Sequence, residues 1–300
     1  MFYIMLITEK FLEYIRVEKR YSANTVTSYR RDLADFTIFL METEGMDDTL
    51  RVDRKIVRNF IISLNEKGLT NRSINRKLSS LRGYYLFLLK VGDIKVSPLE
   101  AIDSLKFYAE KQIPMSQDEM DKLQDVFEEK PDILTQAIIE TLYQTGMRKS
   151  ELCGLLFQDV DFGARIFKVL GKGNKQRQIP MSPDLENVLQ EYLLTRKSLP
   201  DYNHLFFVNQ RGKKLTEKFV YSKVNFYLSY VSSKKKKSPH MLRHSFATHV
   251  LDNGAEIFAV KEILGHASLA STQVYTNASI EQLKKVINQA HPRAKKKDEL

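Results

Sequence analysis

Six side chains from position 148 onward are of types that could together transfer a phosphate group. They are two arginines, a lysine, two histidines and a tyrosine: Arg148, Lys172, His240, Arg243, His266 and Tyr275. Fixed guanidinium groups match the charge of a phosphate under attack, and a tyrosine hydroxyl can attack phosphorus. Lysine or histidine can protonate the departing sugar oxygen. The set therefore predicts phosphodiester transfer without a metal ion.

The spacing of these residues supports the prediction. Arg148 and Glu151 lie three apart on a predicted helix beside Gly146, so the carboxylate could orient the guanidinium. His240 and Arg243 are also three apart at a helix entry. Each feature alone is more often structural, such as a surface ion pair or a hydrogen-bonding histidine, so the prediction depends on the whole set.

Composition limits the class of protein. The chain has 300 residues, 43% hydrophobic and 28% charged, which is typical of a soluble globular protein with two domains. No apolar run approaches the roughly 18 residues of a membrane span. The single Cys153 predicts a reducing compartment. The net charge of +10 favours a polyanionic partner. No carboxylate triad, HExxH or CxxC pattern is present, so we expect no metal and no cofactor.

The first region, 1–105, is predicted to be a helical domain of four helices. Apolar residues recur at steps of three and four at Val26, Tyr29, Leu33, Phe36 and Leu40, and again at Ile74, Leu78, Leu81, Tyr85 and Leu88. Gly45, Gly68 and Gly92 stand where these helices should end.

The helix expected over 69–91 is basic, with no acidic residue. Arg72 and Arg76 share a face with Ser79 and Gly83, opposite the apolar stripe, and such a face can enter a nucleic-acid groove. The DNA-binding residues predicted on this helix are Arg72, Arg76, Lys77 and Arg82. The alternative is an ordinary solvated helix face.

The second region, 106–300, follows a boundary marked by Pro98 and Pro114. Capping-box spacings at Ser116 and Ser279 predict two helix starts. The residues of 165–170 and 177–180 predict an antiparallel hairpin, and 205–208 is a possible third strand. Helices are expected over 215–231 and 240–252. The predicted fold class is mainly α, a helical N-terminal domain followed by an α+β domain with a small antiparallel sheet.

Five segments in order resemble the successive motifs of the tyrosine recombinase (phage integrase) family. They are Thr145–Leu152, Gly171–Arg177, Pro239–His249, Leu264–Ser268 and Thr272–Thr276. Tyr21–Val26 and Tyr29–Leu33 resemble the helical core-binding module of that family. Length and the two-domain plan look most like the Xer-type branch, which resolves chromosome dimers.

The resemblance implies a role for each residue of the set. Arg148 and Arg243 would clamp the scissile phosphate, Lys172 would protonate the leaving 5′ oxygen, and Tyr275 would attack to form a 3′-phosphotyrosyl bond. His240 would assist proton transfer, His266 would hydrogen-bond the phosphate, and Glu151 would support Arg148. The covalent bond would conserve the energy of the phosphodiester, so no ATP would be needed.

The resemblance also implies partners. These are a double-stranded DNA recombination site, a homo-tetramer or a second recombinase on that DNA, and a septum-associated DNA translocase, with no membrane involved and a cytoplasmic, nucleoid-associated location. The final helix, with Leu283, Val286 and Ile287 on one side, resembles the element that family members donate to a neighbouring protomer; the alternative is packing on its own domain. Other functions remain open: a mobile-element integrase, a catalytically silent architectural DNA-binding protein, and, least favoured, a metal-dependent nuclease.

Overall fold

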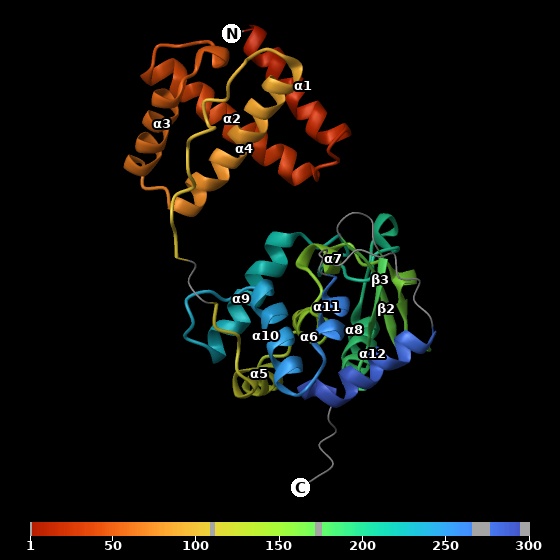
Figure 1. The fold of residues 1–300 in the computed structure, drawn as a ribbon. Coiled ribbons are helices and arrows are strands. Elements are labelled where there is room, and N and C mark those ends of the chain that lie inside the picture. Colours follow the sequence, from red (N-terminus) through yellow and green to blue (C-terminus); the bar gives the residue numbers. More distant parts are fainter. Residues whose placement is uncertain (1, 109–111, 172–175, 266–276, 295–300) are drawn as a thin grey trace. The chain divides into compact units, whose positions relative to one another are not determined.

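The computed structural model describes residues 2–108, 112–171, 176–265 and 277–294. It divides into two compact units, Met1–Glu110 and Lys111–Leu300, each with its own hydrophobic core. Figure 1 labels their principal helices and strands. The fold class is confirmed: the described residues are mostly helical, with one small antiparallel sheet in the second unit.

The first unit is built from four helices: α1 (Phe2–Val17), α2 (Ala23–Thr43), α3 (Arg54–Glu66) and α4 (Asn71–Val91). Thr70 caps α4 by accepting a hydrogen bond from the backbone of Ser73, and Gly92 ends the helix in the left-handed conformation, with φ of 83°. The predicted apolar stripe from Ile74 to Leu88 is fully buried. The sequence periodicity therefore identified the face of α4 that forms the core.

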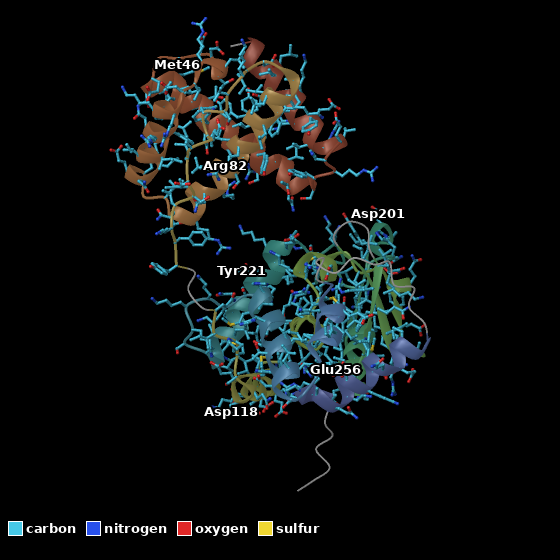
Figure 2. All side chains as sticks on the ribbon, viewed as in Figure 1. Met46, Arg82, Asp118, Asp201, Tyr221 and Glu256 are labelled. Carbon is cyan, nitrogen blue, oxygen red and sulfur yellow. The ribbon has the colours of Figure 1, made fainter. Side chains whose placement is uncertain are left out.

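The chain that leaves α4 runs back along the same helix. Asn75 pairs with both backbone groups of Leu105, its Oδ1 accepting at 2.8 Å and its Nδ2 donating at 2.8 Å. Arg82, labelled in Figure 2, donates from Nη2 to the Ile102 carbonyl at 2.7 Å. One side of α4 therefore carries the segment that leads out of the unit.

The second unit surrounds α6 (Ile133–Thr145), whose side chains are buried over nearly its whole length. It packs between α8 (Pro183–Thr195) and α10 (Pro239–Asp252). The other described helices are α5 (Gln117–Glu129), α7 (Lys149–Cys153), α9 (Glu217–Val231), α11 (Ile257–Leu264) and α12 (Asn277–Ala290). The capping box predicted at Ser116 is present.

The sheet has the order β1 (Val160–Asp161), β2 (Ile166–Leu170) and β3 (Gln176–Pro180), and both pairings are antiparallel. The predicted hairpin is confirmed, with Phe167 opposite Ile179. The third strand was predicted wrongly. Leu205 and Val208 form only isolated bridges, to Leu156 and Lys214, so the apolar run reflects burial in the core and not a strand of the sheet.

The last helix differs from prediction in its start. Helix α12 begins at Asn277, so Ser279 lies within it rather than at its cap. It packs on β3 and α10 of its own chain, where Leu283 and Ile287 are buried. In this single chain, therefore, α12 packs on its own domain, which was the alternative to docking on a neighbouring protomer.

Candidate active site

The site begins where α6 ends. Gly146 ends that helix with φ of 60°, and a Cβ atom there would lie 2.6 Å from side-chain atoms of both Leu264 and Phe246. Only glycine fits such a close approach in this conformation. The tight turn brings Arg148 directly in front of α7, with the last turn of α11 close by.

Arg148 and Glu151 form the predicted pair. Arg148 Nη1 donates to Glu151 Oε1 at 2.7 Å, and the Arg148 backbone amide donates to Oε2 at 2.6 Å. Arg148 Nη2 also lies 3.3 Å from the Gly265 carbonyl. The Arg148 side chain keeps 38% of its surface exposed, whereas that of Glu151 keeps only 5%. The carboxylate thus orients a guanidinium that still reaches solvent.

Arg243 lies beside them, buried on α10. Its Nη1 donates to the Gly146 carbonyl and its Nη2 to the Leu264 carbonyl at 2.6 Å. Burial, followed by the nearby charges of Arg148 and Arg177, lowers the pKa of Arg243 to about 10, so the group stays charged at neutral pH. The structure therefore brings the two predicted phosphate-binding arginines to one place.

A third arginine joins this site, and the sequence reading missed it. Arg177 on β3 is 4% exposed and donates to both oxygens of Glu151, at 2.9 and 2.8 Å. A signal was available, because Arg177 stands two positions before the buried Ile179 in a predicted strand and so shares its inward face. Burying a charged arginine is costly unless it is paired, and Glu151 supplies a buried carboxylate as the partner of Arg177.

The charges of the site do not balance. Arg148, Arg177 and Arg243 surround one carboxylate, that of Glu151. Burial alone would raise the pKa of Glu151, but hydrogen bonds and charge from Arg177, followed by those from Arg148, lower it to about 2. Glu151 is therefore ionised at any working pH, and the cluster retains an excess of positive charge suited to an anion.

His240 is exposed in the first turn of α10, one residue after Pro239, and Ser238 caps this helix. Partial burial, then the charges of Arg243 and His244, lower the pKa of His240 below its usual value. It is thus neutral at pH 7 and able to accept a proton. The other three predicted residues, Lys172, His266 and Tyr275, lie outside the described residues.

The basic face predicted on α4 is smaller than expected. Arg72 is exposed, and Arg76, with 49% of its side chain exposed, is bound to Ser28 and Asp32 of α2. Lys77 is buried, 6% exposed, because it pairs with Asp32 and Asp35.

Arg82 is used within the unit as well, since it holds the chain that follows α4. The prediction of DNA contact is therefore wrong for Lys77, which is buried against Asp32 and Asp35, whereas for the half-buried Arg82 it stays a prediction. Helical spacing places residues around α4, but it does not show which of them α2 and the returning chain cover.

Other features offer little chemistry. Within the described ranges, no three His, Cys, Asp or Glu side chains are grouped to hold a metal ion. Burial raises the pKa of the Cys153 thiol to about 11, which makes it a poor nucleophile. No helix in the described part of the chain is long and apolar enough to span a membrane.

Known proteins resemble both units. Residues 114–282 match the phage integrase family, and residues 8–92 match the phage integrase N-terminal SAM-like domain. A protein named tyrosine recombinase XerC from Oceanobacillus iheyensis is 39% identical, covering 96% of this chain and 97% of the relative. The protein of the same name from Bacillus subtilis is 38% identical, covering 96% and 97%.

Two solved structures have a similar fold. The Tn1549 transposon integrase in complex with transposon right end DNA matches with a TM-score of 0.74 at 22% identity, covering 93% of this chain and 98% of that one. The XerH site-specific recombinase bound to a palindromic difH substrate matches with a TM-score of 0.70 at 23% identity, covering 93% and 83%.

Proposed function

The chain belongs to the phage integrase family and is a tyrosine site-specific recombinase, and from this we propose that it cuts and rejoins double-stranded DNA at a recombination site through Tyr275. The observation that carries the proposal is the convergence of Arg148 and Arg243 on the end of α11, with more positive than negative charge. These cations would bind the nonbridging oxygens of the scissile phosphate and stabilise the charge that builds up there.

The covalent step exchanges one phosphate ester for another. The Tyr275 oxygen forms a bond to phosphorus while the bond from phosphorus to the 5′ oxygen breaks. The phenol proton passes to a base such as neutral His240, and Lys172 supplies a proton to the 5′ oxygen. His266 donates a hydrogen bond to the phosphate. Attack of another 5′ hydroxyl on the phosphotyrosine reverses the step, so the energy of the ester is conserved and no ATP or metal cofactor is required.

A magnitude shows why the cations matter for Tyr275. A phenol with the ordinary pKa of about 10 is ionised in roughly one molecule per thousand at pH 7, equivalent to about 4 kcal/mol. Neighbouring arginines favour the phenolate and offset part of this amount. The same cations stabilise the attacked phosphate, so one cluster serves both reacting groups.

The first unit would provide much of the grip on DNA. Arg72 on α4 and Arg31 on α2 are exposed, and Arg76, which is about half exposed, bonds to Ser28 and Asp32 of α2. Together they form a surface for phosphate contacts, and base contacts by the same helices would give sequence preference. We therefore assign DNA core binding to the first unit and catalysis to the second.

Resolution of chromosome dimers is the role we propose, with four protomers, or two copies each of two recombinases, exchanging strands on paired sites. A septum-associated DNA translocase would control it, and the substrate would place the protein in the cytoplasm with the nucleoid. In the assembly, α12 would dock on a neighbouring protomer. Ile280, Leu283 and Ile287, which are buried in cis, would then need an equivalent apolar surface on that neighbour.

The test is covalent capture. Sheared genomic DNA is incubated with the chain, covalent complexes are isolated after denaturation, and the captured fragments are sequenced to define the site. A duplex of that site with a nick beside the cleavage point, the nicked duplex, then traps the intermediate. We expect a DNA-linked peptide that contains Tyr275, and no adduct from Tyr275→Phe.

The matched control is Tyr221→Phe, which changes an exposed tyrosine on α9 and should react as wild type does. Tight binding without any adduct would instead support the silent architectural protein. Capture of sites only at mobile-element ends would support an integrase.

A further inference from the structure

The three arginines of the site are anchored on consecutive carbonyls. Arg177 Nε donates to Ile263 at 2.7 Å, Arg243 Nη2 to Leu264 at 2.6 Å, and Arg148 Nη2 to Gly265 at 3.3 Å. These carbonyls end α11, where they lack partners inside the helix and carry partial negative charge. The end of α11 is therefore a common support for all three side chains.

Arg177 differs from the other two in its surroundings. Only 4% of its surface is exposed, and all three of its guanidinium nitrogens are already bonded, Nε to Ile263 and the two terminal nitrogens to Glu151. A phosphate could reach it only by breaking those bonds. Arg177 is thus unsuited to binding DNA directly, although it lies within the cationic cluster.

Glu151 is the link between Arg177 and Arg148. Its two oxygens accept four hydrogen bonds, two from Arg177 and two from Arg148, which fill the capacity of a carboxylate. A carboxylate held only by a neighbour three residues away would turn freely and orient it weakly. The planar, two-pronged contact from Arg177 fixes the plane of the carboxylate and hence the direction of the Arg148 head group.

The side chain of Arg177 also packs against Gly265. A Cβ atom at Gly265 would lie 3.0 Å from Arg177 Cδ, and Gly265 itself has φ of 65°. Gly265 immediately precedes His266 in the chain. Arg177 therefore contacts both Glu151, which orients Arg148, and Gly265, the residue directly before His266.

We propose that Arg177 is a positioning residue of the recombinase: it clamps Glu151 against the end of α11, so that Arg148 is held ready for the scissile phosphate. This inference rests on the proposed function, because Arg148 is taken to bind that phosphate. Arg177 itself touches no reacting atom. Its removal should slow cleavage of bound DNA while leaving the affinity for DNA nearly unchanged.

The experiment compares single-turnover cleavage of the nicked duplex at saturating protein with the dissociation constant for the same DNA. We expect Arg177→Gln to slow cleavage by about 10²-fold, the loss typical of a misplaced reacting group, with binding changed less than about threefold. Arg177→Lys keeps the charge without the two-pronged contact and should lose about tenfold. Arg211→Gln, which changes an exposed arginine of the same unit, is the matched control.

Two further readouts separate positioning from general structural damage. First, Glu151→Gln should slow cleavage similarly, and the double variant should be no slower than either single variant, because both act on Arg148 through one link. Second, burial raises the pKa of Glu151 and Arg177 lowers it, so the pKa of Glu151 should rise when Arg177 is removed. Protonation of His240 should slow both proteins as pH drops from 7 to 5, but the ratio of the Arg177→Gln rate to the wild-type rate should fall as well, because wild-type Glu151, with a pKa of about 2, stays ionised throughout.

Several results would overturn the inference. They are a wild-type rate in Arg177→Gln, multiplicative losses of about 10⁴-fold in the double variant, or a loss that does not change with pH. If Arg177→Gln does not fold, as thermal unfolding would reveal, Arg177→Lys and Glu151→Gln provide the same comparison. Absence of an adduct with the wild-type chain would instead contradict the proposed function, so the two failures are distinguishable.

Discussion

Each unit contains a cluster of basic side chains with buried partners, and the two clusters differ in balance. In the second unit three arginines bond to backbone carbonyls at the end of α11, and two of them, Arg148 and Arg177, also bond to the single carboxylate of Glu151. In the first unit Arg76 and Lys77 face two carboxylates, those of Asp32 and Asp35. One cluster retains positive charge, and the other neutralises itself.

This difference separates a binding site from a structural network. Backbone carbonyls hold an arginine in place without cancelling its charge, so the cluster around Glu151 remains attractive to an anion. A carboxylate partner cancels the charge, as Asp32 does for buried Lys77, and the pair then serves to join α2 to α4. A count of basic residues cannot distinguish these cases, whereas the identity of their acceptors can.

The largest effect should come from the unbalanced cluster. Arg243→Ala should slow cleavage of the nicked duplex by at least about 10²-fold, because a preorganised donor to the phosphate is lost. DNA affinity should change little, since most phosphate contacts lie elsewhere. The check is single-turnover cleavage beside a binding titration. An adduct formed at the wild-type rate would remove Arg243 from the site.

Substitutions in the balanced cluster of the first unit should lower the stability of the protein and leave the rate of cleavage unchanged. Asp32→Ala leaves Lys77 buried with only the half-exposed Asp35 as a partner, and we expect a loss of about 2 kcal/mol in the free energy of unfolding. Urea unfolding of the full chain measures it. Asp35→Ala, at an exposed carboxylate, should cost less. Cleavage of saturating DNA by folded Asp32→Ala should match wild type; a slower chemical step would show that the first cluster also serves catalysis.

Mild acid should distinguish the units, because all six histidines lie in the second one. Burial lowers the pKa of His291 to about 3, so below about pH 6.5 the unfolded chain binds a proton that the folded unit excludes. Stability of the second unit should therefore fall as pH decreases from 7 to 5, by up to about 1.4 kcal/mol per pH unit.

Urea unfolding at several pH values measures this dependence. His291→Gln should flatten it, and exposed His204→Gln should leave it unchanged. Equal acid loss in wild type and His291→Gln would contradict the assignment.

The smallest effect is expected on DNA binding by the exposed arginines of the first unit. Each phosphate contact contributes about 0.9 to the slope of log K for DNA against log salt. Arg72→Ala should reduce that slope by about this amount, whereas Arg82→Ala should not, because Arg82 holds the Ile102 carbonyl. Binding titrations across salt concentrations decide it. A reduced slope for Arg82→Ala would place that residue on the DNA surface.

The sequence predicted the helices and the main hairpin well, because their apolar periodicity and caps are local. Ile74 to Leu88, Gly92 and the Ser116 capping box all stand as expected. The third strand was missed because the two residues of β1 are too few to carry a periodic signal, although they pair with nearby Ile166 and Phe167.

The candidate site likewise contains residues that local spacing predicts and residues that depend on contacts distant in sequence. Arg148, Glu151, His240 and Arg243 could be found from residue type and spacing, and the structure brings Arg148, Glu151 and Arg243 together while His240 lies one turn before Arg243 on α10. Arg177 escaped because its meaning lies in contacts with Glu151 and Ile263, far away in sequence. Lys77 was misassigned for the same reason, since its partners belong to α2.

The central claim is that the arginine cluster acts by neutralising phosphate charge, and one substitution in the DNA tests it directly. The nicked duplex is prepared with a methylphosphonate at the scissile position, where a methyl group replaces one charged oxygen. If the cluster neutralises charge, Arg148→Ala should form the Tyr275 adduct far faster on the methylphosphonate than on the ordinary phosphate, approaching the wild-type rate. An Arg148→Ala variant that is equally slow on both substrates would contradict the claim.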